Sequence, residues 1–481
     1  MAFRTELLLT WMKYYCVICN KGGNKMKKIL CFVLAVLMLC CVAGCGGNNP
    51  SSTKEPEDTV VYTYLSEIPT YADDKELEMV AFWSPPSTLE FYQEMVDCGF
   101  TSVVIDSKYG NSAGSQELLN TLAICDQVGI KAFPATNRGI SADLSVDYSQ
   151  YSSFAGFYTD EPLSKSDFDI IESNTQKLND AYPDQDYFYL TTLISDAPTA
   201  YNNDFYYWED YYNYYFEHSG NEQKAFLFDH YPLMGNATKG NISEEWLRIT
   251  EQYALLAKEK GIEIWPYIAT MSYASGTRRR PEEDDMRYQS YVNLAYGAKG
   301  LAYFCYMTPG LPPYDGEFKL SDYALINYED PDDISTYNKT DTWYATQTVN
   351  NELKAFDHVL LSFDWQGVRR SAGSEAATSA GKNCFKNAKN WVKQHDGIKS
   401  INSTEDTIIG IFKDANGYDG FLLVNFSDPL YDCTDTVNLQ FRGATRAVVY
   451  IGGEQQIVEL ADGAYNVTLQ PGEAQFIIPL A

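Results

Sequence analysis

The sequence predicts a (β/α)8 barrel followed by an antiparallel β-sandwich, and three observations lead to this fold class. From about residue 78, eight short apolar runs alternate with amphipathic stretches of helical period, as in parallel strands joined by helices. No G-x-G-x-x-G or phosphate-binding loop follows the first run, which argues against a nucleotide-binding sheet. Beyond residue 362, short strand-like runs and turns replace the long helical stretches, which is typical of a sandwich.

The predicted barrel occupies residues 75–361. Each of its predicted strands is short and rich in aliphatic or aromatic residues, as burial inside a barrel requires. In order, these strands are Met79–Trp83, Thr101–Asp106, Ile130–Pro134, Phe154–Thr159, Tyr187–Leu193, Ala225–Phe228, Ile262–Ile268 and Leu301–Tyr306.

The predicted helices end where glycine or proline interrupts the helical pattern, because glycine readily takes the left-handed conformation of a helix end and proline cannot continue a helix. The aromatic-rich stretch from Phe205 to Phe216 is expected to pack on the barrel as a fifth helix. The other predicted helices are Leu89–Cys98, Gln116–Val128, Lys165–Ala181, Glu244–Lys260, Met286–Ala298 and Thr340–Leu361.

The predicted sandwich occupies residues 362–481, with turns at Asn416-Gly417 and Pro471-Gly472. The segment 414–420 has some features of a calcium loop but lacks its closing Glu, so a hairpin turn is expected there. The predicted strands are Ile408–Phe412, Gly420–Asn425, Thr436–Phe441, Arg446–Ile451, Gln456–Leu460, Tyr465–Leu469 and Ala474–Pro479.

The composition excludes several classes of function. The 481-residue chain has a net charge of −29, so no basic surface can dominate and nucleic acid is not an expected partner. Four histidines without a tight Cys/His cluster argue against a structural zinc site, and the scattered cysteines argue against a disulfide framework. Aromatic residues make up 15% of the chain and include 38 tyrosines, which suits surfaces that stack on flat ligands.

The amino-terminal segment predicts export. Residues 21–25 read like a translated ribosome-binding site, so Met26 is expected to be the true start and residues 1–25 are not expected to be translated. A charged pair and the apolar run Ile29–Cys41 then follow, and the run is too short to span a membrane comfortably. Residues 42–45 (VAGC) resemble the lipobox of bacterial lipoproteins. This implies a signal peptide over 26–44, a lipid on Cys45 as the only membrane contact, and a flexible tether over 45–74 outside the cytoplasm.

Acidic and aromatic residues follow several predicted barrel strands. Ligands of such barrels bind at the carboxyl ends of the strands, where these side chains converge. Cleavage of an acetal needs one carboxyl group to protonate the leaving oxygen and another to support an oxocarbenium-like centre, while aromatic rings stack on the sugar. A carbohydrate ligand is therefore expected. The residues at this end are Trp83, Asp106, Asn137, Asp160, Glu161, Asp229, His230 and Tyr231.

Several of these segments resemble motifs of (β/α)8 glycoside hydrolases of the broad retaining-hydrolase clan, near its beta-galactosidase-like branch. They are residues 156–162 (GFYTDEP), 228–232 (FDHYP), 287–289 (RYQ) and 296–300 (YGAKG), and residues 469–474 (LQPGEA) are similar to the last strand of the accessory β-domain. The resemblance covers most of residues 75–480. It implies cleavage of O-glycosidic bonds without a cofactor, and Glu161 as the general acid/base, because the clan places that Glu at the end of strand 4.

One departure from the clan concerns its nucleophile, a Glu that ends strand 7. Here residues 264–271 (IWPYIATM) carry no acid, and Glu263 lies near the beginning of the strand. Asp229 is the first candidate to replace it, followed by Asp160, Asp106 and Glu317. A carboxyl separation of ~6.5–9.5 Å would indicate inversion and ~5–5.5 Å retention. The alternative is a glycan-binding surface lipoprotein that uses the same barrel without catalysis.

Other candidates for substrate contact each have a structural alternative. Trp83, Tyr158, Tyr231, Trp265 and Tyr267 can stack on sugar or fill the barrel core, and His230 can be a hydrogen-bonded rim residue. Arg278, first of three consecutive arginines, can bind a uronate, sulfate or phosphate group. Its alternative is an ion pair with the acids of residues 282–285.

Overall fold

The computed structural model describes residues 61–105, 115–136, 144–195, 204–218, 223–236, 238–273, 277–309, 323–330, 332–374 and 380–481. The predictions for Cys45, Asp106, Asn137 and Glu317 lie outside these residues. Among the residues described, no helix is long and apolar enough to cross a membrane.

Eight parallel strands close into a barrel in the order β1-β10-β9-β6-β5-β4-β3-β2, which confirms the predicted fold class. The barrel closes through β1 and β10, where Met79 pairs with Leu301. The strands are β1 (Glu78–Ala81), β2 (Ser102–Ile105), β3 (Lys131–Thr136), β4 (Gly156–Thr159), β5 (Phe188–Leu193), β6 (Ala225–Phe228), β9 (Glu263–Ala269) and β10 (Gly300–Phe304).

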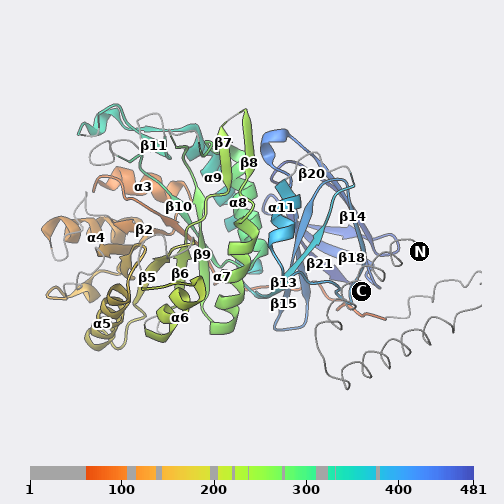
Figure 1. The fold of residues 1–481 in the computed structure, drawn as a ribbon, viewed down its shortest axis with the longest axis horizontal. Coiled ribbons are helices and arrows are strands. Elements are labelled where there is room, and N and C mark those ends of the chain that lie inside the picture. The colour runs from red at the N-terminus through yellow and green to blue at the C-terminus, as the bar shows by residue number, and fades with distance from the viewer. Residues whose placement is uncertain are drawn as a thin grey trace, which may run out of the picture. The chain divides into compact units, whose positions relative to one another are not determined.

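Helices lie outside these strands (Figure 1). Gly129 and Gly261 end α4 and α7 in the left-handed conformation, as predicted. Helix α8 begins before the predicted Met286, because Glu282 and Asp285 form a capping box. The helices are α3 (Leu89–Asp97), α4 (Gln116–Val128), α5 (Lys165–Ala181), α6 (Trp208–His218), α7 (Trp246–Lys260), α8 (Glu283–Ala295), α9 (Asp341–Lys354) and α10 (Asp357–Leu360).

A hairpin that the sequence analysis did not predict follows β6. Strands β7 (Leu233–Asn236) and β8 (Lys239–Ile242) pair in antiparallel fashion, and the loop after β9 adds to β7 through a bridge between Met234 and Arg278. This loop and the hairpin thus form one structure beside the carboxyl end of β6.

The carboxyl-terminal part forms two antiparallel sheets with a buried apolar cluster that includes Ile409, Leu423, Val437 and Leu439. One sheet has the order β13-β15-β16-β21-β18-β19 and the other β14-β17-β20, as a sandwich requires. The strands are β13 (Phe363–Ser371), β14 (Ile398–Ser403), β15 (Thr407–Asp414), β16 (Asp419–Asn425), β17 (Asp435–Phe441), β18 (Arg446–Ile451), β19 (Glu454–Glu459), β20 (Ala464–Leu469) and β21 (Ala474–Leu480), and helix α11 (Ala380–Asn387) lies between β13 and β14. At residues 414–419 the chain makes the expected hairpin turn, where Asp414 accepts backbone hydrogen bonds from Asn416 and Tyr418.

Residues 61–77, here called the strap, lie against the sandwich. Tyr62 donates a hydrogen bond to Asp419 (2.5 Å), and Tyr64 donates one to the carbonyl of Gly397 (2.7 Å). The backbone N–H of Ala481 donates to the carbonyl of Leu65 (3.0 Å). The described part of the predicted tether is thus fixed by side-chain and backbone hydrogen bonds.

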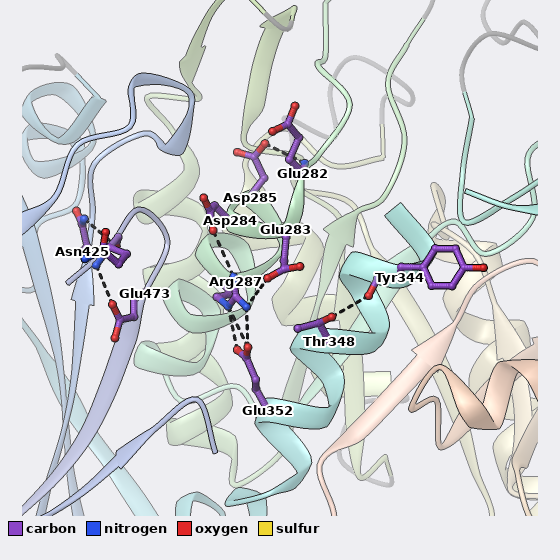
Figure 2. A network of polar contacts seen from close by, with 11 residues as sticks. Glu282, Glu283, Asp284, Asp285, Arg287, Tyr344, Thr348, Glu352, Asn425 and Glu473 are labelled. Atoms are coloured by element: carbon purple, nitrogen blue, oxygen red, sulfur yellow. Dashed lines mark hydrogen bonds and ion pairs between the residues drawn. The ribbon is translucent and has the colours of Figure 1, made fainter. Parts of the chain in front are cut away.

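Polar contacts join the barrel helices to one another and to the sandwich. Figure 2 shows Arg287 of α8 between the acids of its own helix and Glu352 of α9, with which it makes three hydrogen bonds of 2.7, 2.9 and 3.2 Å. Between barrel and sandwich, Arg279 pairs with Asp285 (2.6 Å) and Asp428 (2.7 Å), and all three side chains are buried. Buried charges are costly unless they are paired, so these contacts fix the two domains against each other.

Candidate active site

The carboxyl end of β4 directs one acid toward the barrel interior. Alternation along the strand places Phe157 among the residues that face the helices and Tyr158 in the cluster inside the barrel. The next inward position belongs to Asp160, and its carboxylate accepts a hydrogen bond from the Tyr158 hydroxyl (2.9 Å). The same hydroxyl contacts Thr192 (2.8 Å) and Tyr267 (3.3 Å), so β4, β5 and β9 meet at one polar point.

A second acid reaches the same point from β6. Burial is the main cause that raises the pKa of Tyr267, and the charges of Asp160 and Asp229 raise it further. Burial likewise raises the pKa of Tyr231, and both carboxylates add to the effect. Both acids follow barrel strands at the carboxyl end, Asp160 after β4 and Asp229 after β6, and both act electrostatically on the same two phenols. Two acids that lie far apart in the sequence are thus at the same end of the barrel.

Glu161 and Trp83 share an unusual backbone conformation. Glu161 has φ of 35° and Trp83 has φ of 64°, both in the left-handed region that residues with a side chain rarely adopt. Both residues are half-buried, and each follows a barrel strand at the carboxyl end. Backbone strain of this kind is concentrated at functional sites, where the surrounding structure enforces it.

Aromatic rings line this end of the barrel, which is called the mouth below. Trp83 stacks on Phe82 with ring centres 5.6 Å apart, and Phe304 lies 5.6 Å from Phe82 and from Tyr231. Trp83 and Tyr273 are half-buried, whereas Tyr158, Tyr231 and Tyr267 are buried. The half-buried rings are thus the ones a sugar can contact, while the buried Tyr158 directs its hydroxyl group to Asp160.

His230 is held neutral. Its Nε2 lies 2.8 Å from the hydroxyl of Ser243, and burial together with the charges of Arg278 and Arg248 lowers its pKa to about 3. The structure matches the alternative of a hydrogen-bonded rim residue.

Trp265 is not at the mouth, contrary to its prediction as a stacking residue. Its indole N–H donates to Glu263 (3.0 Å), and its ring covers Gly300, where an added Cβ would lie 2.6 Å from the indole. It also contacts Phe188 edge-on. Glu263, Gly300 and Phe188 begin their strands, so Trp265 fills the opposite end, here called the floor, as barrel core.

The three consecutive arginines have three different surroundings. Arg279 pairs with Asp285, as the structural alternative predicted, but its second partner is Asp428 of the sandwich. Arg280 donates to Thr342 (3.1 Å). Arg278 instead lies at the mouth, with its guanidinium carbon 5.2 Å from the ring centre of Tyr231 and 5.5 Å from that of Tyr273.

The end of β9 serves a structural role where the clan places its nucleophile. Thr270 is buried and donates to the carbonyl of Cys305 (2.8 Å), and Gln289 hydrogen-bonds both backbone groups of Ala269. Thr192 and Tyr273, which the sequence analysis did not select, belong to the site. Their position along the chain could have identified them, because Thr192 lies near the carboxyl end of β5 and Tyr273 lies four residues beyond the end of β9.

Among the residues described, one group has the geometry for a metal ion. Asp169, Glu172 and His218 offer ligand atoms within 4.8 Å of one another. They belong to helices α5 and α6, the two acids are exposed, and His218 already lies 3.2 Å from Glu172. This group lies outside the mouth, and exposed acidic groups of this kind are common without a metal.

No protein-family model matches the chain, and no curated protein matches its sequence. The solved structures with similar folds include AmyP in complex with maltose (9% identity, TM-score 0.45, 84% of this chain and 97% of that one). They also include a GH27 β-L-arabinopyranosidase from Geobacillus stearothermophilus (11%, 0.45, 85% and 97%). A putative alpha-galactosidase from Bacteroides fragilis is a third (10%, 0.44, 84% and 79%).

Proposed function

We propose that this chain hydrolyses O-glycosidic bonds at the barrel mouth, with Asp160 and Asp229 as the reacting carboxyl groups. The observation that carries the proposal is the hydrogen bond from the Tyr158 hydroxyl to Asp160 at the point where β4, β5 and β9 meet, with Asp229 following β6 at the same end of the barrel. Two carboxyl groups beside half-buried aromatic rings are the minimal equipment for cleaving a sugar acetal.

The hydrogen bonding of Asp160 favours one of the two roles for this acid and leaves the other role to Asp229. The hydrogen bond from Tyr158 stabilises the ionised form of Asp160, so this carboxylate faces the sugar carbon that becomes positively charged. Asp229 is then the acid that gives its proton to the leaving oxygen, while the bond from that oxygen to the sugar carbon breaks and Asp160 bonds to the same carbon. In a second step Asp229 takes a proton from water, whose oxygen bonds to this carbon as the bond to Asp160 breaks. In the inverting alternative there is a single step, in which Asp160 takes the proton of the attacking water.

Glu161 remains the second candidate for the proton donor. The clan resemblance favours it, and the strained backbone at φ of 35° is the structural observation in its favour.

Hydrolysis assays on a panel of oligosaccharides test these roles with Asp160→Asn, Asp229→Asn and Glu161→Gln. We expect the first two variants to keep affinity for the glycan while kcat falls by at least about a hundredfold. A hundredfold loss in Glu161→Gln with near-normal turnover in Asp229→Asn would move the proton donor to Glu161. The anomer released, followed by NMR, separates direct attack by Asp160 (retention) from attack by water (inversion).

A glycan-binding protein without catalysis is the second candidate, because β9 is followed by buried Thr270 where the clan carries its nucleophile. Such a protein binds a glycan with the same affinity in wild type and in Asp160→Asn, and turns over none of the panel. Hydrolysis by the wild type that is lost in this variant would exclude it.

We further propose an extracytoplasmic location with a lipid on Cys45, supported by the lipobox-like residues 42–45. Mass spectrometry of the mature chain from a bacterial membrane fraction tests this. A mature protein that begins at Cys45 with a lipid mass increment is the expected result, and a chain that keeps residues 26–44 would contradict it.

A further inference from the structure

Arg278 belongs to a rigid part of the mouth. Its backbone carbonyl accepts a hydrogen bond from the N–H of Tyr273 (3.2 Å), and the residues on either side of it bond to β7. These bonds run from Gly235 N–H to the Thr277 carbonyl (2.9 Å) and from Arg279 N–H to the Leu233 carbonyl (3.2 Å). The position of this arginine is therefore set by a ladder of backbone hydrogen bonds.

The side chain of Arg278 is held as firmly as its backbone. One terminal nitrogen, Nη1, donates to the carbonyl of Tyr231, and the guanidinium lies over the rings of Tyr231 and Tyr273. The two rings lie nearly perpendicular to each other (80°), so cation–π contact with both restricts the position of the guanidinium from two sides. Tyr231 is also the phenol that both Asp160 and Asp229 influence, so Arg278 borders the proposed reaction centre.

No ion pair occupies this guanidinium among the residues that the structure describes. Its neighbour Arg279 has two carboxylate partners, and the other arginine of the loop, Arg280, donates to Thr342. Arg278 forms hydrogen bonds only through Nη1 within the described chain, which leaves the edge of Nε and Nη2 for a ligand. That edge is the fork that binds a carboxylate or sulfate through two parallel hydrogen bonds.

The charge of the rest of the protein gives this arginine a selective role. With a net charge of −29 and two acids at the mouth, the chain repels an anionic sugar unless a cation receives it. The nearby His230 is neutral because its pKa is lowered to about 3, so it cannot supply that cation near neutral pH. Arg279 stabilises the fold through its two buried ion pairs, whereas Arg278 makes no ion pair of this kind within the described residues.

We propose that Arg278 binds an anionic group of the sugar substrate, a uronate carboxylate or a sulfate ester, and so selects acidic glycans. This inference deepens the proposed function, on which it rests for the place of the substrate. The guanidinium clamp between Tyr231 and Tyr273 then acts as a specificity determinant next to the reacting acids.

The test compares matched pairs of oligosaccharides that differ only in charge. One arm uses oligouronides and their carboxyl-reduced counterparts, and the other uses sulfated oligosaccharides and their desulfated counterparts. For each pair, kcat/KM and the dissociation constant are measured for wild type, Arg278→Gln, Arg278→Lys and the control Arg280→Gln. The arm that shows the preference identifies the anionic group.

We expect wild type to prefer the charged member of one pair, and Arg278→Gln to reduce this preference at least about tenfold. Arg278→Lys keeps the charge but not the fork, so it retains an intermediate preference, and Arg280→Gln leaves the preference unchanged. A wild type that prefers the neutral member in both pairs, or an unchanged preference in Arg278→Gln, would overturn the inference. Because binding is measured separately, loss of turnover alone contradicts the proposed function and not the role of Arg278.

Discussion

The two ends of the barrel carry similar residues in different surroundings. At the floor, Glu78 accepts hydrogen bonds from Thr101 (3.1 Å) and Ser102 (2.7 Å) and pairs with Lys131, and Glu263 binds the indole of Trp265. At the mouth, Asp160 and Asp229 lie around tyrosine hydroxyl groups, beside half-buried rings and a stacked arginine. The floor acids are bonded to hydroxyl, ammonium and indole groups of neighbouring strands, whereas the mouth acids lie at the end where half-buried aromatic rings are open to a ligand. An acid or a tryptophan therefore indicates a ligand site only when it lies at the mouth, at the carboxyl ends of the strands.

Matched substitutions of an acid at each end give the largest expected difference. Asp229→Asn should lower kcat by at least about a hundredfold, because it removes the proposed proton donor. Glu263→Gln at the floor should change kcat by less than about threefold, because this acid lies at the far end of β9, away from the reacting groups. Steady-state kinetics on one glycan measures both, and equal losses would remove the distinction between the two ends.

The tryptophans provide the next comparison, this time through stability. Trp265→Ala should lower the free energy of unfolding by about 3–5 kcal/mol, because a large buried side chain leaves a cavity. Trp83→Ala should cost less stability, since Trp83 is only half-buried, but should weaken glycan binding. Urea unfolding and binding assays on both variants measure this, and a reversed order of the two stability losses would contradict it.

His230 makes the mouth sensitive to acid. Its pKa is about 3 in the folded protein against 6.5 normally, so below pH 6.5 the unfolded chain takes up a proton that the folded chain does not. The free energy of unfolding of wild type should therefore fall by about 1–2 kcal/mol relative to His230→Gln between pH 7 and pH 5. Parallel unfolding curves across this range would show that His230 titrates normally.

Lys299 at the floor should respond in alkali, and with the same sign, because its pKa is also lowered in the folded protein. Burial lowers its pKa to about 8, so between pH 8 and 10.5 the unfolded chain holds a proton that the folded chain has released. Stability of wild type relative to Lys299→Met should rise by about 2 kcal/mol from pH 8 to pH 10. Denaturant unfolding at these two pH values checks this, and a fall would show that the lysine stays charged in the folded protein.

The sequence predicted the barrel well because its strands are short apolar runs that end at clear signals. All eight strands lie within a few residues of their predicted ranges, and Gly129 and Gly261 end helices as expected. Strands β13 and β14 were missed because β13 carries Arg369 and Arg370 and β14 is mostly polar, so neither is an apolar run. The β7-β8 hairpin was missed because its four-residue strands carry little hydrophobic pattern.

The candidate site was harder to predict, because assigning a residue to a strand does not show whether its side chain lies near the floor or near the mouth. Trp265 and Tyr267 both point inward from β9, yet two residues of strand separate a floor residue from one that bonds to Tyr158. The different roles of Arg278 and Arg279 could not be predicted from the sequence either, because one partner of Arg279 is Asp428, nearly 150 residues further along the chain. Contacts between distant segments therefore decide which of these two adjacent arginines is buried in an ion pair and which lies at the mouth.

The position of the strap makes a circular permutation of the chain possible. Its Leu65 is hydrogen-bonded to Ala481, so the first and last described segments are neighbours in space. A short peptide can therefore link residue 481 to residue 61, and new termini can be opened at the exposed turn of Asn416 and Gly417 without removing a strand. Such a circularly permuted protein would keep the barrel in one uninterrupted piece, with its mouth intact.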